Sequence, residues 1–152
     1  MYPFEHDYLD RMGWLHSEIE RQFCYLPQDA LDWSPASDIP SICVLVTHLL
    51  GAERYWIGDV AAGDSSDRDR DAEFVAKGCN QNELISRMLA SREYSGEVIR
   101  KVKHEDLSDK RISPRDGSEI TVGWALSYTL EHTAIHLGHI QIIRQLWEQR
   151  KN

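Results

Sequence analysis

The chain has 152 residues, of which 41% are hydrophobic and 28% charged, and its formal net charge is −8 at pH 7. This length and composition are typical of one globular domain and exclude disordered and membrane-spanning chains. The acidic balance and the absence of a stripe of Lys and Arg argue against nucleic acid as a partner, because phosphate binding needs clustered cations. We therefore expect a single domain over residues 1–152.

The sequence shows no feature that would direct the chain to a membrane or to secretion. No apolar run approaches the roughly 20 residues that span a bilayer, and the first residues lack the basic and apolar regions of a secretory signal. The three cysteines, Cys24, Cys43 and Cys79, are an odd and widely spaced set. They indicate neither a disulfide framework nor a thiolate zinc site. We expect a cytoplasmic protein with buried, reduced thiols.

A first amphipathic helix is predicted from about Tyr8 to Phe23. Its apolar stripe recurs at steps of three and four residues and comprises Leu9, Met12, His16, Ile19 and Phe23. His16 thus lies on or next to the buried face, where it is expected to be a core histidine that can approach a site in the interior. Residues 25–40 are rich in Pro, Asp and Ser and are predicted to form a loop.

A second helix is predicted from Ile42 to about Val60, with Ser41 as its N-cap. Its first half is apolar nearly all round, as expected of a well-buried element, and His48 is its only strongly polar side chain besides Thr47. A buried histidine needs a partner, because an unsatisfied polar group costs about 1–3 kcal/mol. A metal ion would serve, and so would a carbonyl or hydroxyl group. His48 taken alone favours the carbonyl or hydroxyl.

The middle of the chain contains an acidic loop, a third helix and a hairpin. Residues 59–73 carry six Asp and Glu and are expected to be a solvated, mobile loop, because they lack the glycine and glutamate of a calcium loop. The third helix is predicted from about Asn82 to Val102, capped by Asn80 or Asn82. Asp116-Gly117 lies between two short β-prone runs in residues 110–122, which predicts a small hairpin or extended loop.

The fourth helix is predicted from Val122 or Gly123 to Arg150, with Thr121 as its N-cap. Two largely apolar rows indicate that it packs against more than one neighbour. One row is Leu126, Leu130, Ala134, Leu137, Gln141, Arg144 and Trp147, and the other is Trp124, Tyr128, His132, Ile135, His139, Ile142 and Leu146. Gly138 lies in mid-helix, where glycine is costly. We therefore expect a neighbouring helix or a bound ligand to approach closely there.

Three histidines of the fourth helix, His132, His136 and His139, project from one face. Imidazoles at i and i+4 can share one metal ion, whereas His132 and His139 lie about 10.5 Å apart along the axis, which is too far. The candidate pair is therefore 132/136 or 136/139, and a divalent metal needs at least one more ligand. Four amphipathic helices predict an all-α four-helix bundle, in which His48 would meet His132 and His136.

These residues resemble those of the DinB/YfiT-like superfamily of bacterial four-helix-bundle metalloproteins. The resemblance extends over nearly the whole chain and is carried, in order and spacing, by Ser41–Ile42, Leu45–Trp56, Thr121–Trp124 and His132–Ile140. It implies a metal site of one histidine from the second helix and two from the fourth, which are His48, His132 and His136 here. His139 takes a position near the ligands where this family often has glutamine, and it is expected to be a hydrogen-bonding partner, a proton shuttle or a packed residue.

The resemblance also implies a divalent transition metal, with nickel, zinc and manganese as candidates. Members include low-molecular-weight-thiol S-transferases, a maleylpyruvate isomerase type and presumed hydrolases, and homodimers are common among them. Three neutral imidazoles leave coordination positions open, which is typical of catalytic rather than structural zinc. Each ligand needs an acceptor for its other ring nitrogen. The candidates are Thr47, Glu53, Tyr128 and Glu131.

Three hypotheses for function follow. In the first, the chain is an enzyme whose metal activates a thiol or water for transfer to, or hydrolysis of, a small electrophilic substrate. In the second, it is a non-catalytic metal- or small-molecule-binding bundle of a stress response, in which a fourth protein ligand such as His16 or Glu53 would complete the site. In the third, all seven histidines are packing or surface groups and no metal binds.

Overall fold

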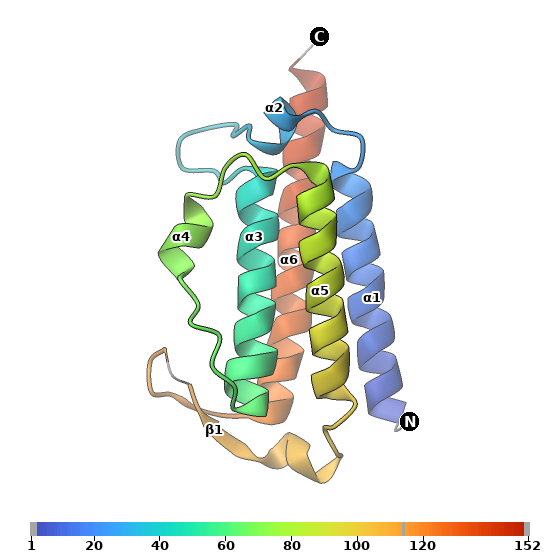
Figure 1. Cartoon of the computed structure of the whole chain (residues 1–152), viewed down its shortest axis with the longest axis vertical. Helices are drawn as coiled ribbons and strands as arrows, with labels where there is room; N and C mark the ends of the chain where they lie inside the picture. The colour runs from blue at the N-terminus through green and yellow to red at the C-terminus, as the bar shows by residue number, and fades with distance from the viewer. Residues whose placement is uncertain (1–2, 114, 151–152) are drawn as a thin grey trace.

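Four long helices run side by side along the long axis of the molecule in the computed structural model (Figure 1), which describes residues 3–113 and 115–150. They are α1 (Pro3–Phe23), α3 (Ile42–Glu53), α5 (Gln81–Ile99) and α6 (Val122–Gln149). The predicted all-α four-helix bundle is confirmed. The ends of the predicted domain and Pro114 of the predicted hairpin lie outside the described residues.

The connections give the bundle an up-down-down-up arrangement. α1 and α6 run in one direction, whereas α3 and α5 both run in the other (Figure 1). The chain must therefore return along the outside of the bundle between α3 and α5, and residues 63–80 make this crossing. Bundles with one such crossover connection are well known. Here the crossing matters because it lies against α3, which carries His48.

Local sequence signals set the helix boundaries. Ser41 accepts a hydrogen bond from the Val44 amide and caps α3, Asn80 accepts from Glu83 and caps α5, and Thr121 accepts from Trp124 and caps α6. Each cap satisfies an amide that the helix leaves unpaired. The predicted caps Ser41 and Thr121 are confirmed, and Asn80 is the cap of the two candidates, Asn80 and Asn82, that were predicted for the third helix.

Shorter elements complete the fold. α3 continues directly into η1 (Arg54–Ala62), a π-helix, so that together they cover the predicted second helix. Two short helices, α2 (Gln28–Leu31) and α4 (Arg70–Phe74), lie in segments expected to be loops. The 3₁₀ helix η2 (Glu105–Ser108) precedes the antiparallel hairpin of β1 (Lys110–Ile112) and β2 (Glu119–Thr121). This confirms the hairpin, whose turn places Gly117 at a φ of 72°.

The core lies between the four long helices. Its largest fully buried side chains are Met12, Ile19, Phe23, Leu31, Ile42, Leu45, Leu49, Ile57, Leu84, Met88, Ile99 and Leu126. α6 packs against α1, α3 and η1, as expected of a helix with several neighbours. However, the second apolar row predicted for α6, which begins at Trp124, does not make most of these contacts. Four members of that row, Trp124, Ile135, Ile142 and Leu146, are exposed.

Of the two roles expected of Gly138, the close approach of a neighbouring helix is wrong. A Cβ built at this position would meet no described atom within 4 Å, so no neighbouring helix approaches closely there. Gly51 on α3 is the glycine that permits close approach. A Cβ at Gly51 would collide with a carboxylate oxygen of Glu73.

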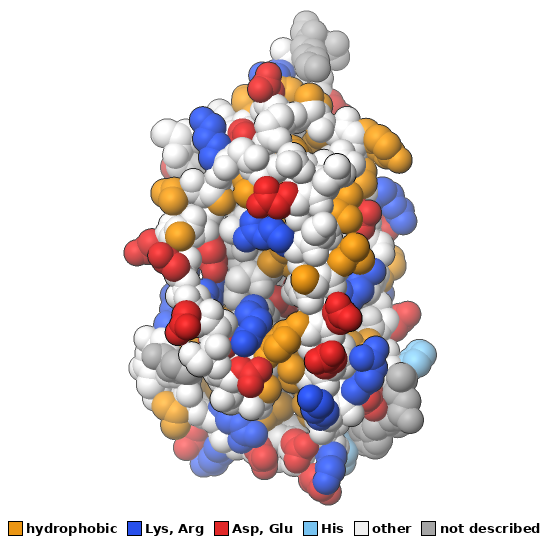
Figure 2. All heavy atoms as spheres, viewed as in Figure 1, with side chains coloured by type: hydrophobic (Ala, Val, Ile, Leu, Met, Phe, Trp, Pro, Cys, Tyr) orange, Lys and Arg blue, Asp and Glu red, His pale blue; other side chains and the backbone are white. Residues whose placement is uncertain are grey.

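The surface shows no broad basic patch on the face drawn in Figure 2, where acidic and basic side chains are interspersed. Among the described residues, no helix combines the length and the apolar character that crossing a bilayer requires.

Candidate metal centre

α3 and α6 bring three histidine side chains together from two distant parts of the sequence. His48 is 6% exposed, and His132 and His136 are half-buried. The His48 ring centroid lies 5.1 Å from each of the other two, which are 4.4 Å from one another. One potential ligand atom from each residue lies within 4.8 Å of the others, and this is the one such group of His, Cys, Asp or Glu among the described residues.

His132 and His136 present their nitrogens to each other. Their Nε2 atoms are 3.1 Å apart across one helical turn. Burial, followed by the neighbouring imidazoles, lowers the pKa of His132 from 6.5 to about 3 and that of His136 to about 4. Both rings are therefore neutral at pH 7, which is the protonation state that metal coordination requires.

Glu73 orients the third histidine. Its Oε2 lies 2.9 Å from His48 Nδ1, and because an ionised carboxylate only accepts hydrogen bonds, the proton is on Nδ1. The lone pair of His48 is therefore on Nε2. This carboxylate–histidine arrangement is the one that commonly sets the tautomer of metal-binding histidines.

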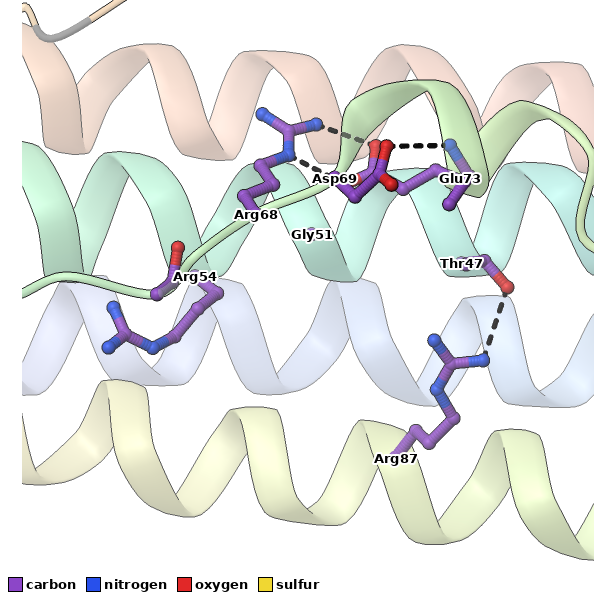
Figure 3. Close-up of a pocket in the computed structure, with 9 residues that line it drawn as sticks. Thr47, Gly51, Arg54, Arg68, Asp69, Glu73 and Arg87 are labelled. Carbon is purple, nitrogen blue, oxygen red and sulfur yellow. Dashed lines mark hydrogen bonds and ion pairs between the residues drawn. The ribbon is translucent and has the colours of Figure 1, made fainter.

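Arg68 holds the Glu73 carboxylate through two hydrogen bonds (Figure 3). Arg68 Nε donates to Oε1 at 2.6 Å and Nη2 donates to Oε2 at 2.8 Å. Burial by itself would raise the pKa of Glu73, but the hydrogen bonds from Arg68 and His48 lower it below 4.5. The carboxylate is thus ionised at neutral pH and is a fixed acceptor for His48.

The chain segment that carries Glu73 was expected to be a solvated, mobile loop, and for α4 this expectation is wrong. Asp69 caps α4 by accepting a hydrogen bond from Ala72 at 3.0 Å, and Glu73 itself is 7% exposed. The ring of Phe74 lies 4.6 Å from the ring of His48. Glu73 is one of several acidic residues in this segment, and no periodic pattern distinguishes it from the others. The sequence therefore gave no signal that Glu73 would be buried beside His48.

None of the four residues proposed as partners of the ligands hydrogen-bonds to one in the described structure. Thr47 accepts a hydrogen bond from Arg87, and Glu53 pairs with His16. The ring of Tyr128 lies 5.7 Å from that of His132, as a packing contact. Glu131 is exposed on the surface of α6. Instead, Glu73 is the hydrogen-bond acceptor for the second ring nitrogen of His48.

His139 is close to the cluster but is not a member of it. It is exposed, and its Nδ1 lies 3.4 Å from Nδ1 of His136. It is therefore placed to hydrogen-bond with the second ring nitrogen of His136. The same side chain lines a cavity of ≈ 310 Å³, whose other walls are Pro35, Asp38, Ile39, Pro40, Leu45, Ile142, Ile143 and Leu146.

His16 lies elsewhere, in the bundle interior. Its Nε2 is 2.8 Å from Glu53 Oε2, and both side chains are fully buried. The pair joins α1 to α3 and leaves neither side chain in the histidine cluster. His16 is thus a core histidine with a buried partner, which agrees with the first of the two roles predicted for it.

The donor set fits a divalent transition metal. It consists of three neutral imidazoles, which suit zinc, nickel, copper and iron. One of them has its tautomer set by a carboxylate that is itself held by an arginine. That these residues bind a metal stays a prediction.

Removing the Glu73 carboxylate is expected to weaken metal binding 10- to 100-fold, the usual cost of losing such an outer partner. In Glu73→Ala, the His48 ring loses its acceptor and Arg68 loses its ion pair. Titration calorimetry with Ni²⁺ or Zn²⁺ measures the change. Asp71→Ala, an exposed carboxylate on the same short helix, is the control and should bind as the wild type does. Equal affinities for the two variants would contradict this role of Glu73.

The metal-free protein is expected to lose stability as pH falls from about 6.5 towards 4. The unfolded chain takes up protons at the ordinary histidine pKa of 6.5, whereas folded His132 and His136 resist protonation down to about 3 and about 4. The unfolded state then binds more protons, so the free energy of unfolding decreases with falling pH. Urea unfolding between pH 7 and pH 4.5 measures this slope. The dependence of the unfolding free energy on pH should be shallower in a His132→Gln/His136→Gln variant. An unchanged slope would show that these two histidines do not cause the loss of stability.

The fold and the site together define a class of four-helix bundles. In this class the chain crosses over before the third long helix, and a cluster of three histidines lies between the second and fourth long helices. The profile of the family described as mycothiol-S-transferase matches residues 14–149. The chain belongs to this family and to the DinB/YfiT-like superfamily. No curated protein sequence matches the chain.

Several solved structures share the fold. YfiT from Bacillus subtilis, described as a probable metal-dependent hydrolase with an unusual four-helix bundle topology, superposes with a TM-score of 0.78 at 11% identity, over 97% of this chain and 90% of that one. A conserved protein from Enterococcus faecalis gives a TM-score of 0.80 at 16% identity, over 96% and 98%. At these identities the likeness concerns the fold alone.

Proposed function

We propose that the chain is a metal-dependent thiol S-transferase, which joins a low-molecular-weight thiol to a small electrophile. One observation carries the proposal: His48, His132 and His136 converge within 4.8 Å from two helices. The family description supports mycothiol as the thiol. Metal-assisted hydrolysis is the alternative reaction for the same residues.

The three histidines would hold the ion, and Glu73 with Arg68 would keep His48 in the correct tautomer. When bound, a divalent metal lowers the pKa of a coordinated thiol or water, so that a nucleophile is available near neutral pH. In the transfer, the thiol sulfur bonds to the electrophilic carbon, the leaving group departs with the bonding pair, and the thiol proton passes to solvent.

The donor count favours catalysis over a purely structural role. His16 and Glu53, the residues considered as fourth ligands, are bound to each other in the core. The cluster therefore offers three protein ligands and leaves room in the coordination sphere for thiol or water, as catalytic sites do.

The cavity beside His139 supplies a place for the electrophile. Its walls are largely apolar, with Ile39, Leu45, Ile142 and Leu146 among them, and its volume is ≈ 310 Å³. His139 links it to the cluster through its 3.4 Å approach to His136. Small-molecule sites commonly combine apolar walls with a few polar groups. We infer that the apolar part of the electrophile binds here.

The test is an assay of the metal-loaded protein with mycothiol and an alkyl halide such as monobromobimane. We expect the wild-type protein to accelerate this reaction above its spontaneous rate, and His136→Ala to lose the acceleration. The acceleration should be seen with mycothiol and not with other thiols. Tight metal binding without acceleration of this reaction or of amide and ester hydrolysis would refute catalysis and favour the non-catalytic alternative. Absence of metal binding would refute the site itself.

A further inference from the structure

Three arginine side chains line one cavity between α3, α5 and the crossover segment, residues 63–80 (Figure 3). Arg54 extends from η1, Arg68 from the crossover segment and Arg87 from α5. A second cavity, of ≈ 430 Å³, shares Arg54 and Arg87 with the first. Volumes of this size are typical of small-molecule sites. The first cavity has a volume of ≈ 350 Å³, and its other walls are Thr47, Gly51, Ser66, Asp69, Ala72 and Glu73.

Two of the three guanidinium groups already have carboxylate partners. Arg54 Nη1 donates to Asp59 Oδ1 at 2.9 Å, and Arg68 donates two hydrogen bonds to Glu73. The other carboxylate of the lining, Asp69, caps α4. The acidic groups around the cavity are therefore engaged with partners of their own.

Arg87 is the exception among the three arginines. It is half-buried, and its Nη1 lies 3.3 Å from Thr47 Oγ1 and 3.7 Å from the sulfur of Cys79. Within residues 3–113 and 115–150, no carboxylate forms an ion pair with Arg87, and its Nε and Nη2 groups donate no hydrogen bond. A guanidinium carries five N–H donors and a permanent positive charge. Arg87 therefore presents a cation with free donors to the cavity.

We propose that this cavity binds a small molecule through an oxyanion group, a carboxylate or a phosphate, that Arg87 and Thr47 hold. The planar fork of a guanidinium matches two oxygens of such a group. Thr47 Oγ1 accepts the hydrogen bond from Arg87, so its own proton is available to the same anion. The adjoining cavity, which Arg87 also lines, leaves space for the rest of the molecule.

The cavity adjoins the metal centre and is separate from it. Glu73 lines the cavity and hydrogen-bonds to His48, whereas none of the three clustered histidines is part of the lining. The oxyanion would therefore be held by the protein and not by a metal ion. The inference does not depend on metal binding or on transferase activity.

Titration calorimetry of the full chain with inorganic phosphate and, separately, with succinate tests the proposal. The protein is first stripped of metal and freed of chelator, and the titrations are run at pH 7 and constant ionic strength, so that general screening is equal throughout. We expect saturable binding of at least one of the two anions, with one anion per chain. The anion that binds more tightly identifies the group, carboxylate or phosphate, that the site prefers.

Arg87→Gln is expected to weaken this binding at least about tenfold, the order expected for the loss of a charge-assisted hydrogen bond. Arg21→Gln is the matched control. Arg21 is an exposed arginine of α1 that lines neither cavity, and its loss should leave the affinity unchanged. Circular dichroism verifies that both variants are folded, and the wild-type titration needs no variant.

No saturable binding of either anion by the wild type would overturn the proposal, as would equal affinities of the wild type and Arg87→Gln. Binding that requires a loaded metal and disappears in His136→Ala would place the anion on the metal ion, and would overturn it as well. The test reads anion binding to the metal-free chain, whereas the transferase proposal is tested by thiol transfer in the metal-loaded protein. Failure of one is therefore distinguishable from failure of the other.

Discussion

His136→Ala is expected to lose its metal during purification while the bundle stays folded, and His132→Ala is expected to behave alike. Each change removes one of three imidazole ligands, so the affinity should fall by more than the 100-fold that the loss of an outer partner can cost. The fold should persist because both side chains are only half-buried. The contact between their rings, at 3.1 Å, joins two residues of the same helix and no other element. Elemental analysis and far-ultraviolet circular dichroism measure the two quantities.

His139→Ala is the matched control for these variants. It removes an exposed histidine three residues away on the same helix, and we expect nearly full metal occupancy. The comparison also decides between the two ligand pairs that helical spacing allows. Full occupancy in His132→Ala together with loss in His139→Ala would show that the pair is 136/139, and would contradict the present assignment.

Glu53→Ala is expected to destabilise the protein by about 1–3 kcal/mol, the usual cost of leaving a buried polar group without its hydrogen-bonding partner. The change leaves His16 fully buried without its only hydrogen-bonding partner, since its Nδ1 makes no bond to the described residues. Urea unfolding at pH 7 measures the loss. Glu93→Ala, an exposed carboxylate on α5, should change the free energy of unfolding by less than about 0.5 kcal/mol.

A double variant separates the loss of the pair from the loss of packing. His16→Leu/Glu53→Leu replaces both polar groups by apolar ones, which is often neutral or stabilising for buried pairs. We expect it to regain most of the stability lost in Glu53→Ala. A Glu53→Ala variant within 1 kcal/mol of the wild type would show that the pair is not buried as described.

The fold was predictable because helix signals are local. Ser41, Asn80 and Thr121 each stand just before an apolar periodic segment, and each is the observed N-cap. The rise of the helix then brings residues four apart onto one face. This is why the neighbourhood of His132 and His136 could be predicted from spacing.

The pairing of long-range partners was not predictable in the same way. Glu73 reaches His48 because residues 63–80 cross the outside of the bundle, and Gly51 leaves space for the carboxylate. Neither the crossing nor the space has a local sequence signal.

The exposed row of α6 shows a second limit. Trp124, Ile135 and Ile142 are apolar and follow helical periodicity, yet they face solvent in this structure. Periodicity identifies an apolar face, and the topology decides whether a neighbouring element covers it. Homodimer formation, which the family resemblance implies, and cytoplasmic location, which the sequence led us to expect, stay predictions.

The coordination sphere of the metal-loaded protein tests the central claim most directly. A crystal structure of the protein with Ni²⁺ or Zn²⁺ is expected to show nitrogens of His48, His132 and His136 about 2.0–2.1 Å from the ion, with at least one position occupied by solvent. Glu73 should keep its hydrogen bond to Nδ1 of His48. An ion bound by other residues, or a fourth protein ligand that closes the site, would contradict the account.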